Sequence, residues 1–239
     1  MSNFKVSVIL PVINETFSLE KTIEIIIKNS KEDISEIIII VSKNKTTQNS
    51  LKLIKNLEKN QYPNLIKTHF QDLPFLGGAI QKGFQISKGT HIIMMASDLE
   101  TDPNDVKNLI KLSKLHPSSI ITANRWIKGG SFSKYNIIKF YLNFLFQFLL
   151  RCIFLTKLSD MTYGYRIFPS KLVKEIKWKE LKHPFLLETI LKPLLMKINV
   201  IEIPSKWVAR SEGNSQNTFI GNFRYIKTAL MVKFFWKKK

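Results

Sequence analysis

The stretch Glu-Ile-Ile-Ile-Ile-Val-Ser, residues 36–42, decides the fold. Its central residues, 37–41, are all isoleucine or valine, so no polar side chain interrupts the run. A strand of this kind has both faces buried, which is typical of a parallel sheet covered by helices on each side. We therefore predict an α/β protein in which this stretch is a strand with two apolar faces.

Further apolar runs and helical patterns alternate on both sides of this stretch. The predicted strands are residues 5–12, 36–42, 65–70, 91–97 and 119–123, and the predicted helices are residues 18–29, 47–59, 78–87 and 103–115. The alternation indicates βαβ units and a Rossmann-like, mostly parallel sheet flanked by helices. Ligands bind beyond the carboxyl ends of the strands in such sheets, so we expect a site at that edge.

The second half of the chain has a different pattern. It contains a very apolar helix at 140–155, a strand-like segment at 162–168, a helix at 185–197, a strand at 200–207 and a terminal helix from about 221. A chain of 239 residues suits one α/β domain with a modest appendage. We predict a catalytic domain at 1–218 and a basic amphipathic helix at 219–239.

The composition is strongly basic. Lysine and arginine number 37 against 18 acidic residues, a net charge of +19. This charge indicates an anionic partner, whether nucleic acid, an acidic membrane surface or a phosphate-bearing substrate, or else only a solvated lysine-rich surface. The single cysteine, Cys152, excludes an internal disulfide and fits a reducing cytosol. The apolar run near the amino end is broken by Pro11, so we interpret it as a first strand rather than a signal peptide.

Three acidic residues follow the predicted strand 91–97. In Met-Met-Ala-Ser-Asp-Leu-Glu-Thr-Asp-Pro, residues 94–103, they are Asp98, Glu100 and Asp102. If this segment is extended, the three side chains point to one side. Asp102 before Pro103 matches a helix N-cap followed by proline at the first helical position. Asp98 and Glu100 are either solvated loop acids or ligands of Mg²⁺ or Mn²⁺, with phosphate oxygens completing the shell.

The helix predicted at 140–155 is almost entirely apolar. Its polar residues Asn143, Gln147 and Arg151 follow Lys139 at steps of four, which places them in one stripe. No stretch of the chain reaches the roughly 20 apolar residues needed to span a bilayer. We expect the helix to lie in a protein groove or on a membrane interface.

Six segments, in this order, resemble motifs of the family 2 glycosyltransferases, in particular the branch of dolichol-phosphate mannosyltransferase and bacterial polyprenyl-phosphate sugar transferases. They are VSVILPVINE (6–15), ASDLETDP (96–103), TANRWIKGG (122–130), NFLFQFLLR (143–151), SDMTYGYRIF (159–168) and EIPSKWVARSEGNS (202–215). The resemblance runs from residue 6 to about residue 215 and implies a GT-A-like fold with amphipathic helices on the acceptor side and at the carboxyl end.

The resemblance also implies a set of site residues. Asp98 and Glu100 would hold a divalent cation, Mg²⁺ or Mn²⁺, and Arg210 would contact phosphate, although Arg210 beside Glu212 also fits a surface ion pair. The donor side would be formed by Pro11, Glu15, Ser42, Lys43, Gly78 and Asp98. The acceptor side would be formed by the basic residues Arg125, Lys134, Lys139 and Arg166.

Two departures from the family pattern bear on the donor. The family's second strand ends in D-D-G-S-x-D, whereas residues 41–46 here read Val-Ser-Lys-Asn-Lys-Thr. Lysines therefore stand where the family has acids that grip the nucleoside, and we expect Lys43 and Lys45 to neutralise phosphate charge. The first aspartate of the metal motif is Ala96, and Glu100 falls on a metal-contacting glutamine position.

The resulting expectation is an inverting, metal-assisted glycosyltransferase that uses a nucleotide sugar and does not bind nucleic acid. Its acceptor would be polyprenyl phosphate or a lipid-linked glycan, reached from the cytoplasmic face of an anionic membrane with help from the basic, aromatic tail 223–239. A lipid phosphate is already ionised near neutral pH, whereas a sugar hydroxyl needs a base, for which Asp160 and Glu188 are candidates. The alternatives are a non-catalytic basic binding module and a nucleotidyltransferase, although no glycine-rich, lysine-ended loop follows the first strand.

Overall fold

The computed structural model describes residues 4–210, 212 and 221–237. The first half contains β1 (Val6–Val12), α1 (Phe17–Ser30), β2 (Ile34–Val41), α2 (Gln48–Asn56), the π-helical turn η1 (Leu57–Gln61), β3 (Ile66–Phe70), α3 (Phe75–Ile86), β4 (His91–Met94), α4 (Asp105–Leu115) and β5 (Ile120–Asn124). The second half contains β6 (Ser131–Ser133), α5 (Ile137–Phe154), β7 (Arg166–Pro169), α6 (Ser170–Glu175), α7 (Phe185–Leu195), β8 (Val200–Pro204), β9 (Lys206–Val208) and α8 (Gly221–Phe235).

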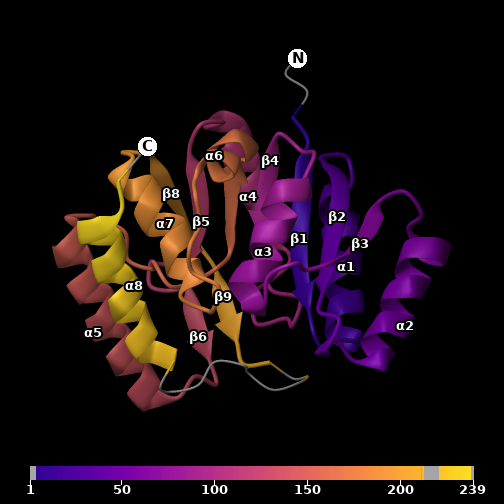
Figure 1. Ribbon diagram of the computed structural model, residues 1–239, viewed down its shortest axis with the longest axis horizontal. Helices are drawn as coiled ribbons and strands as arrows, with labels where there is room; N and C mark the ends of the chain where they lie inside the picture. The colour runs from indigo at the N-terminus through magenta and orange to yellow at the C-terminus, as the bar shows by residue number, and fades with distance from the viewer. Residues whose placement is uncertain (1–3, 211, 213–220, 238–239) are drawn as a thin grey trace.

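A seven-stranded sheet with the order β3-β2-β1-β4-β7-β5-β8 forms the centre of the molecule (Figure 1). Strand β7 is antiparallel to its neighbours β4 and β5, and the other pairs are parallel. Strands β6 and β9 form a separate small parallel sheet. The mostly parallel α/β fold is therefore confirmed.

Helices cover both faces of the central sheet. Along β2, Ile37, Ile39 and Val41 belong to the core beneath α1, α2 and α4. Ile38 and Ile40 belong to the core on the other face, beneath α3, α6 and α7, where α5 and α8 also contribute. All five side chains are at most 1% exposed. The strand with two apolar faces is thus confirmed, and burial of each such side chain stabilises the fold by about 1.5–3 kcal/mol.

Several predicted boundaries moved. Helix α4 begins at Asp105 rather than at 103, because Asp102 caps the preceding turn by accepting hydrogen bonds from the backbone and side-chain nitrogens of Asn104 (3.0 and 2.8 Å). The N-cap of the helix is thus Asn104, two residues later than predicted, and Asp102 caps the turn before it. The predicted strand 200–207 is divided into β8 and β9 by Ser205, and the short elements β6 and α6 were not predicted.

Helix α5 is longer and more exposed than expected. It begins three residues earlier than the apolar run suggested, because the side chain of Asn136 accepts a hydrogen bond from the backbone of Lys139 and caps it. Of its 18 residues only Gln147, Leu150 and Phe154 are buried, and by length and composition alone the helix could cross a membrane. The expectation that no segment was long enough for a span was therefore too strict.

Helix α8 packs on the rest of the molecule. Its residues Tyr225, Ala229 and Val232 are buried in the same core as α7 (Figure 1). Its other faces carry exposed apolar residues, including Leu230, Phe234 and Phe235, so its apolar side chains are not confined to one stripe. The predicted boundary at 218–219 lies outside the described residues.

Candidate functional site

The loop after β4 brings Asp98 and Glu100 together. Leu99 adopts a left-handed conformation (φ +60°), so the loop turns instead of continuing as an extended strand. The backbone N–H of Glu100 donates to Oδ1 of Asp98 at 3.1 Å. The three acids therefore do not share one side: Asp98 and Glu100 face each other, whereas Asp102 bonds to Asn104.

Arg210 forms ion pairs with both of these carboxylates. Its Nη2 lies 2.8 Å from Oδ2 of Asp98, and its Nε donates to Oε1 of Glu100 at 2.8 Å. The backbone of the chain around β9 is tied to the same loop, since the N–H of Val208 donates to the carbonyl of Glu100 at 3.3 Å. The structure brings Asp98, Glu100 and Arg210 together, while their roles towards metal and phosphate stay predictions. The alternative pair of Arg210 with Glu212 is not formed in the described structure.

Glu212 has a different function. Its carboxylate accepts hydrogen bonds from the backbone N–H groups of Thr16 and Ser18, both at 2.9 Å, and from their hydroxyls, at the start of α1. Although burial opposes ionisation, these donors prevail and lower the pKa of Glu212 to about 2. Glu212 is therefore held at the start of the first helix.

The carboxylates of Asp98 and Glu100 repel each other, and burial of Asp98 adds to the cost of its charge. Burial of Asp98, together with the negative charges of Glu100 and Glu15, raises its pKa to about 6, and Arg210 only partly offsets this. Burial disfavours the charged form of Arg210, yet Glu100 and Asp98 raise its pKa. Two carboxylates, with Glu15 nearby, thus share one guanidinium, which leaves the cluster with more negative than positive charge.

The residues present fit a hard divalent cation that binds together with a substrate. Asp98 is buried, while the side chain of Glu100 is 22% exposed. Within the described ranges, no three His, Cys, Asp or Glu side chains gather into a metal cage. Mg²⁺ is commonly held by one or two carboxylates with substrate phosphates and water completing its shell. Asp98 and Glu100 offer that incomplete set of ligands.

The predicted donor residues lie around the ends of β1 and β2. The carbonyl of Pro11 accepts a hydrogen bond from Ser97, and Glu15 accepts from the backbone N–H groups of Ile13 and Asn14. The backbone N–H of Ser42 donates to Thr46 Oγ1 at 2.8 Å. The bond from Ser97 places Pro11 beside the Asp98 loop, and Glu15 is close enough for its charge to raise the pKa of Asp98.

Lysines gather near the ends of β2 and β3. The Nζ of Lys43 lies 6.0 Å from the ring centre of Phe70, and the Nζ atoms of Lys45 and Lys182 lie 5.3 and 4.6 Å from that of Phe75. None of the three lysines has an acidic partner among the residues that the structure describes. This part of the edge is therefore suited to anionic groups.

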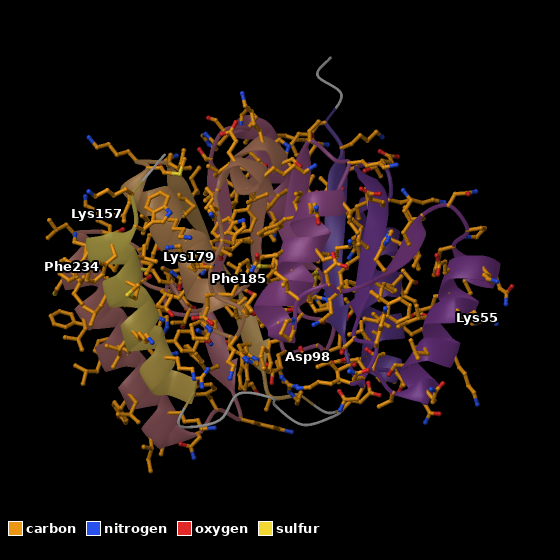
Figure 2. The ribbon with its side chains drawn as sticks, viewed as in Figure 1. Lys55, Asp98, Lys157, Lys179, Phe185 and Phe234 are labelled. Carbon is orange, nitrogen blue, oxygen red and sulfur yellow. The ribbon has the colours of Figure 1, made fainter. Side chains whose placement is uncertain are left out.

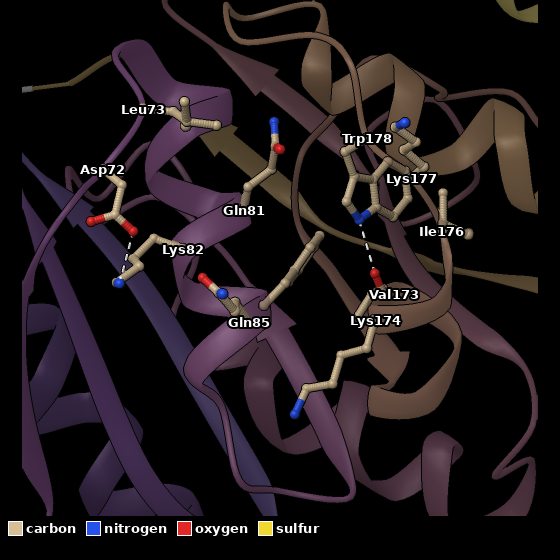
Figure 3. A pocket seen from close by; sticks show the side chains of 12 residues that line it. Asp72, Leu73, Gln81, Lys82, Gln85, Val173, Lys174, Ile176, Lys177 and Trp178 are labelled. Atoms are coloured by element: carbon tan, nitrogen blue, oxygen red, sulfur yellow. Dashed lines mark hydrogen bonds and ion pairs between the residues drawn. The ribbon is translucent and has the colours of Figure 1, made fainter.

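The contacts of Gly78 differ from those predicted. A Cβ at this position would lie 2.2 Å from the carbonyl oxygen of Leu73, so glycine permits α3 to pass close to the preceding loop. Gly78 lines a hollow of about 440 Å³ between α3 and α6 (Figure 3). Two of its lysines are engaged within the protein, with Lys82 bonded to Asp72 at 2.8 Å and Lys174 to the carbonyl of Ser87 at 2.6 Å. The structure therefore does not join Gly78 to the Asp98 site.

Two of the predicted acceptor-side arginines are structural. Arg166 is fully buried and donates to Thr122, Leu186, Thr189 and Met161, so no part of it is open to a ligand. The prediction that it contacts the acceptor was wrong, because a guanidinium so enclosed must satisfy its donors within the protein. Arg125 is likewise buried in an ion pair, described next.

Asp160 and Glu188 do not occupy the position of a catalytic base. Asp160 is 1% exposed and binds Arg125 through both oxygens at 2.7 and 2.8 Å. Glu188 is 2% exposed, binds Lys192 at 2.5 Å and accepts hydrogen bonds from the backbone of Lys179 and Glu180. Both carboxylates are satisfied by partners that fix loops and helices, so the structure argues against a base role for either.

Lys134 and Lys139 remain available on the predicted acceptor side. Both are exposed, Lys139 in the first turn of α5 and Lys134 three residues before the helix begins. They lie beside the exposed apolar residues Ile137, Ile138 and Tyr141. Basic side chains and an apolar surface therefore occur together at this end of the helix.

The sheet and the cluster of carboxylates and arginine at its edge define an α/β protein with a candidate ligand site beyond the carboxyl ends of its parallel strands. The chain belongs to glycosyl transferase family 2, whose model matches residues 7–177. It is 25% identical over 231 residues to a dolichol-phosphate mannosyltransferase of Pyrococcus furiosus, which covers 93% of this chain but 62% of that protein. It is 22% identical over 264 residues to a dolichyl-phosphate beta-glucosyltransferase of Dictyostelium discoideum, covering 100% of this chain and 78% of that protein.

The fold is shared with solved structures. Glucosyl-3-phosphoglycerate synthase from Mycobacterium tuberculosis, in complex with Mn²⁺, UDP and phosphoglyceric acid, superposes with a TM-score of 0.73 at 14% identity. The match covers 98% of this chain and 80% of that one. The same enzyme has been solved with Mg²⁺ and UDP, with a TM-score of 0.72 at 14% identity over 96% of this chain and 79% of that one. At this identity the likeness establishes the fold.

Proposed function

We propose that this protein is an inverting glycosyltransferase that moves a sugar from a nucleotide-sugar donor to polyprenyl phosphate or a lipid-linked glycan, with the assistance of Mg²⁺ or Mn²⁺. The observation that carries the proposal is the convergence of Asp98, Glu100 and Arg210 beyond the carboxyl ends of β1 and β4. This edge of a parallel sheet is where such folds bind ligands. The family membership and the names of the relatives support the same chemistry.

The chemical requirement is stabilisation of the departing diphosphate. Negative charge develops on the leaving oxygen as the bond to the sugar breaks, so fixed positive charge nearby lowers the barrier. A cation held by Asp98 and Glu100 would supply Lewis-acid charge at that point. Arg210 suits the same task because its planar fork binds phosphate oxygens in pairs. Arg210 now bonds to both carboxylates, so we expect it to turn from them towards the phosphates when donor and cation bind together.

The acceptor is proposed to be ionised already. Asp160 and Glu188 are occupied by buried partners, so neither provides an obvious base. A phosphomonoester has a second pKa of about 6 and needs no base near neutral pH. Attack by its oxygen from the side opposite the leaving group is a single displacement that inverts the sugar carbon. The relatives named for dolichol phosphate and undecaprenyl phosphate support an acceptor of this class.

The surface of α5 is proposed to rest on an anionic membrane, on its cytoplasmic side. Its exposed apolar residues include Tyr141, Leu142, Phe144, Leu145, Phe148 and Leu149. Contiguous exposed apolar residues mark interaction sites, and nearby lysines favour anionic lipid. A lipid-linked acceptor would then be reached without leaving the bilayer surface.

The donor half is tested by thermal melting and calorimetry with UDP, GDP, CDP and dTDP sugars, with and without Mg²⁺ or Mn²⁺. We expect one nucleotide sugar to stabilise the wild-type protein only with the cation, and Asp98→Asn to lose that effect. Asp102→Asn, which alters an acid of the same loop outside the cluster, is the matched control and should behave as wild type. Absence of stabilisation by every donor would reject the enzyme in favour of a non-catalytic basic binding protein.

A further inference from the structure

A groove between α7 and α8 lies outside the cluster of Asp98 and Arg210. It has a volume of about 440 Å³, within the range of small-molecule sites. We propose that this groove binds the phosphate head and the first part of the hydrocarbon chain of a prenyl monophosphate. The inference rests on the proposed function, because it assigns a binding place to the acceptor.

The wall formed by α8 is divided into a basic half and an apolar half. The residues of this wall that line the groove follow helical spacing and form one stripe, which ends one residue beyond the helix: Arg224, Lys227, Thr228, Met231, Val232, Phe235 and Trp236. Positive charge is confined to the first part of the stripe and apolar surface to the second. At 1.5 Å per residue, the stripe extends about 18 Å, enough for an amphiphile lying along the helix.

The acids in the groove are already satisfied. One oxygen of Glu180 accepts from the backbone of Leu181 and Lys182, and the other accepts from Thr228 Oγ1 at 3.0 Å. Glu188 is paired with Lys192, which is 1% exposed. The oxygens of both acids are therefore engaged by internal contacts, while Glu180 keeps its negative charge among the groove's cations.

Three cations remain for a ligand. Lys179, Arg224 and Lys227 line the groove and are exposed, and none has an acidic partner within the described part of the chain. Three such charges next to an apolar channel complement a doubly charged phosphate joined to a hydrocarbon. A neutral lipid would leave the cations unused, and a free nucleotide would leave the apolar half unused.

The groove is linked to the catalytic cluster by a short loop. Lys179 and Glu180 line the groove, and three residues later the burial of His183 and the charge of Arg210 lower the His183 pKa. Helix α8 also begins at the end of the molecule where β1 and β4 end, and Asp98 lies at that end too (Figures 1 and 2). A phosphate at the basic half would therefore lie at the same end of the molecule as Asp98.

The test uses farnesyl monophosphate as the probe and tryptophan fluorescence as the readout, since Trp236 lines the apolar half. We expect saturable binding by the full chain, with farnesol and inorganic phosphate each binding at least about tenfold more weakly. Arg224→Ala with Lys227→Ala should weaken binding by on the order of tenfold or more, since removing one charge-assisted hydrogen bond to the phosphate lowers affinity by about tenfold. Lys233→Ala is the control, because Lys233 lies on the same helix over the ring of Phe154 on α5.

The outcomes separate this inference from the proposed function. Binding that survives Arg224→Ala with Lys227→Ala but disappears in Lys134→Ala with Lys139→Ala would overturn the groove and place the acceptor at α5. Binding of a nucleotide sugar without binding of farnesyl monophosphate would also overturn the groove, while the donor site stands. Groove-dependent binding of farnesyl monophosphate without any nucleotide binding would keep the groove and reject the transferase. A variant that weakens only binding to anionic vesicles would make the groove a headgroup site and overturn the proposal.

Discussion

Replacing Asp98 by asparagine is expected to stabilise the fold while removing function. Burial and the charges of Glu100 and Glu15 raise the pKa of Asp98 from its ordinary 3.8 to about 6. At about 1.36 kcal/mol per pH unit, this difference corresponds to roughly 3 kcal/mol. Because the folded pKa is the higher one, the stability associated with this group is fully present below about pH 4 and is lost as the pH rises through about 6. Asparagine stays neutral at every pH, so the Asp98→Asn protein keeps this stability as the pH rises.

The assay is urea unfolding of both proteins between about pH 5 and pH 8, without nucleotide or metal. We expect Asp98→Asn to be more stable by up to about 3 kcal/mol above pH 6, with a difference that shrinks on acidification. Glu24→Gln is the control, since Glu24 is exposed on α1 in a surface pair with Lys21, and its curve should follow the wild type. An Asp98→Asn protein that is less stable at every pH would refute the reasoning, because the attraction of Arg210 would then outweigh burial and like-charge repulsion.

Three further predictions concern the scaffold and the surface. Asp160→Asn should lower the free energy of unfolding by about 3–5 kcal/mol in urea titrations, because it leaves the buried guanidinium of Arg125 without its charged partner; a loss below about 1 kcal/mol would contradict this. Gly130→Ala should cost about 1–3 kcal/mol by the same measurement, since a Cβ there would lie 2.7 Å from the carbonyl oxygen of Arg125, and unchanged stability would show that the turn can relax. Leu145→Ser with Phe148→Ser should leave unfolding nearly unchanged but weaken sedimentation with anionic vesicles by on the order of tenfold per residue, because both side chains are 53% exposed on α5. Unchanged vesicle binding would remove α5 from the membrane contact.

The sequence predicted the parallel part of the fold well because its strands are nearly continuous apolar runs. The apolar side chains of residues 37–41 need helices on both faces of the sheet to be buried. Asp98 and Glu100 come directly after another apolar run, so the sequence places them at the end of a buried strand. Short elements were missed for a physical reason: β6 has only the three residues Ser131–Ser133, and its pairing with β9 depends on contacts distant in sequence. Local propensity carries little information about such pairing.

The site was predicted in part. Arg210 meets Asp98 and Glu100 as the motif order suggested, but Arg166 and Asp160 have structural roles. A motif gives the residue type and its position along the chain, and it does not show whether the donors and acceptors of a side chain are already satisfied. That information requires the partners, which for Arg166 come from three other segments of the chain. The groove along α8 was missed because its two walls are far apart in sequence.

Strand β7 has a consequence for biosynthesis. Its four residues, Arg166–Pro169, are inserted between β4 and β5, although β4 and β5 precede it in the chain. While the polypeptide is being made, those two strands have unsatisfied edges until residue 169 has left the ribosome. Such edges invite pairing with other chains. Fragments that stop before β7 should therefore aggregate, and the shortest soluble amino-terminal fragment should include it.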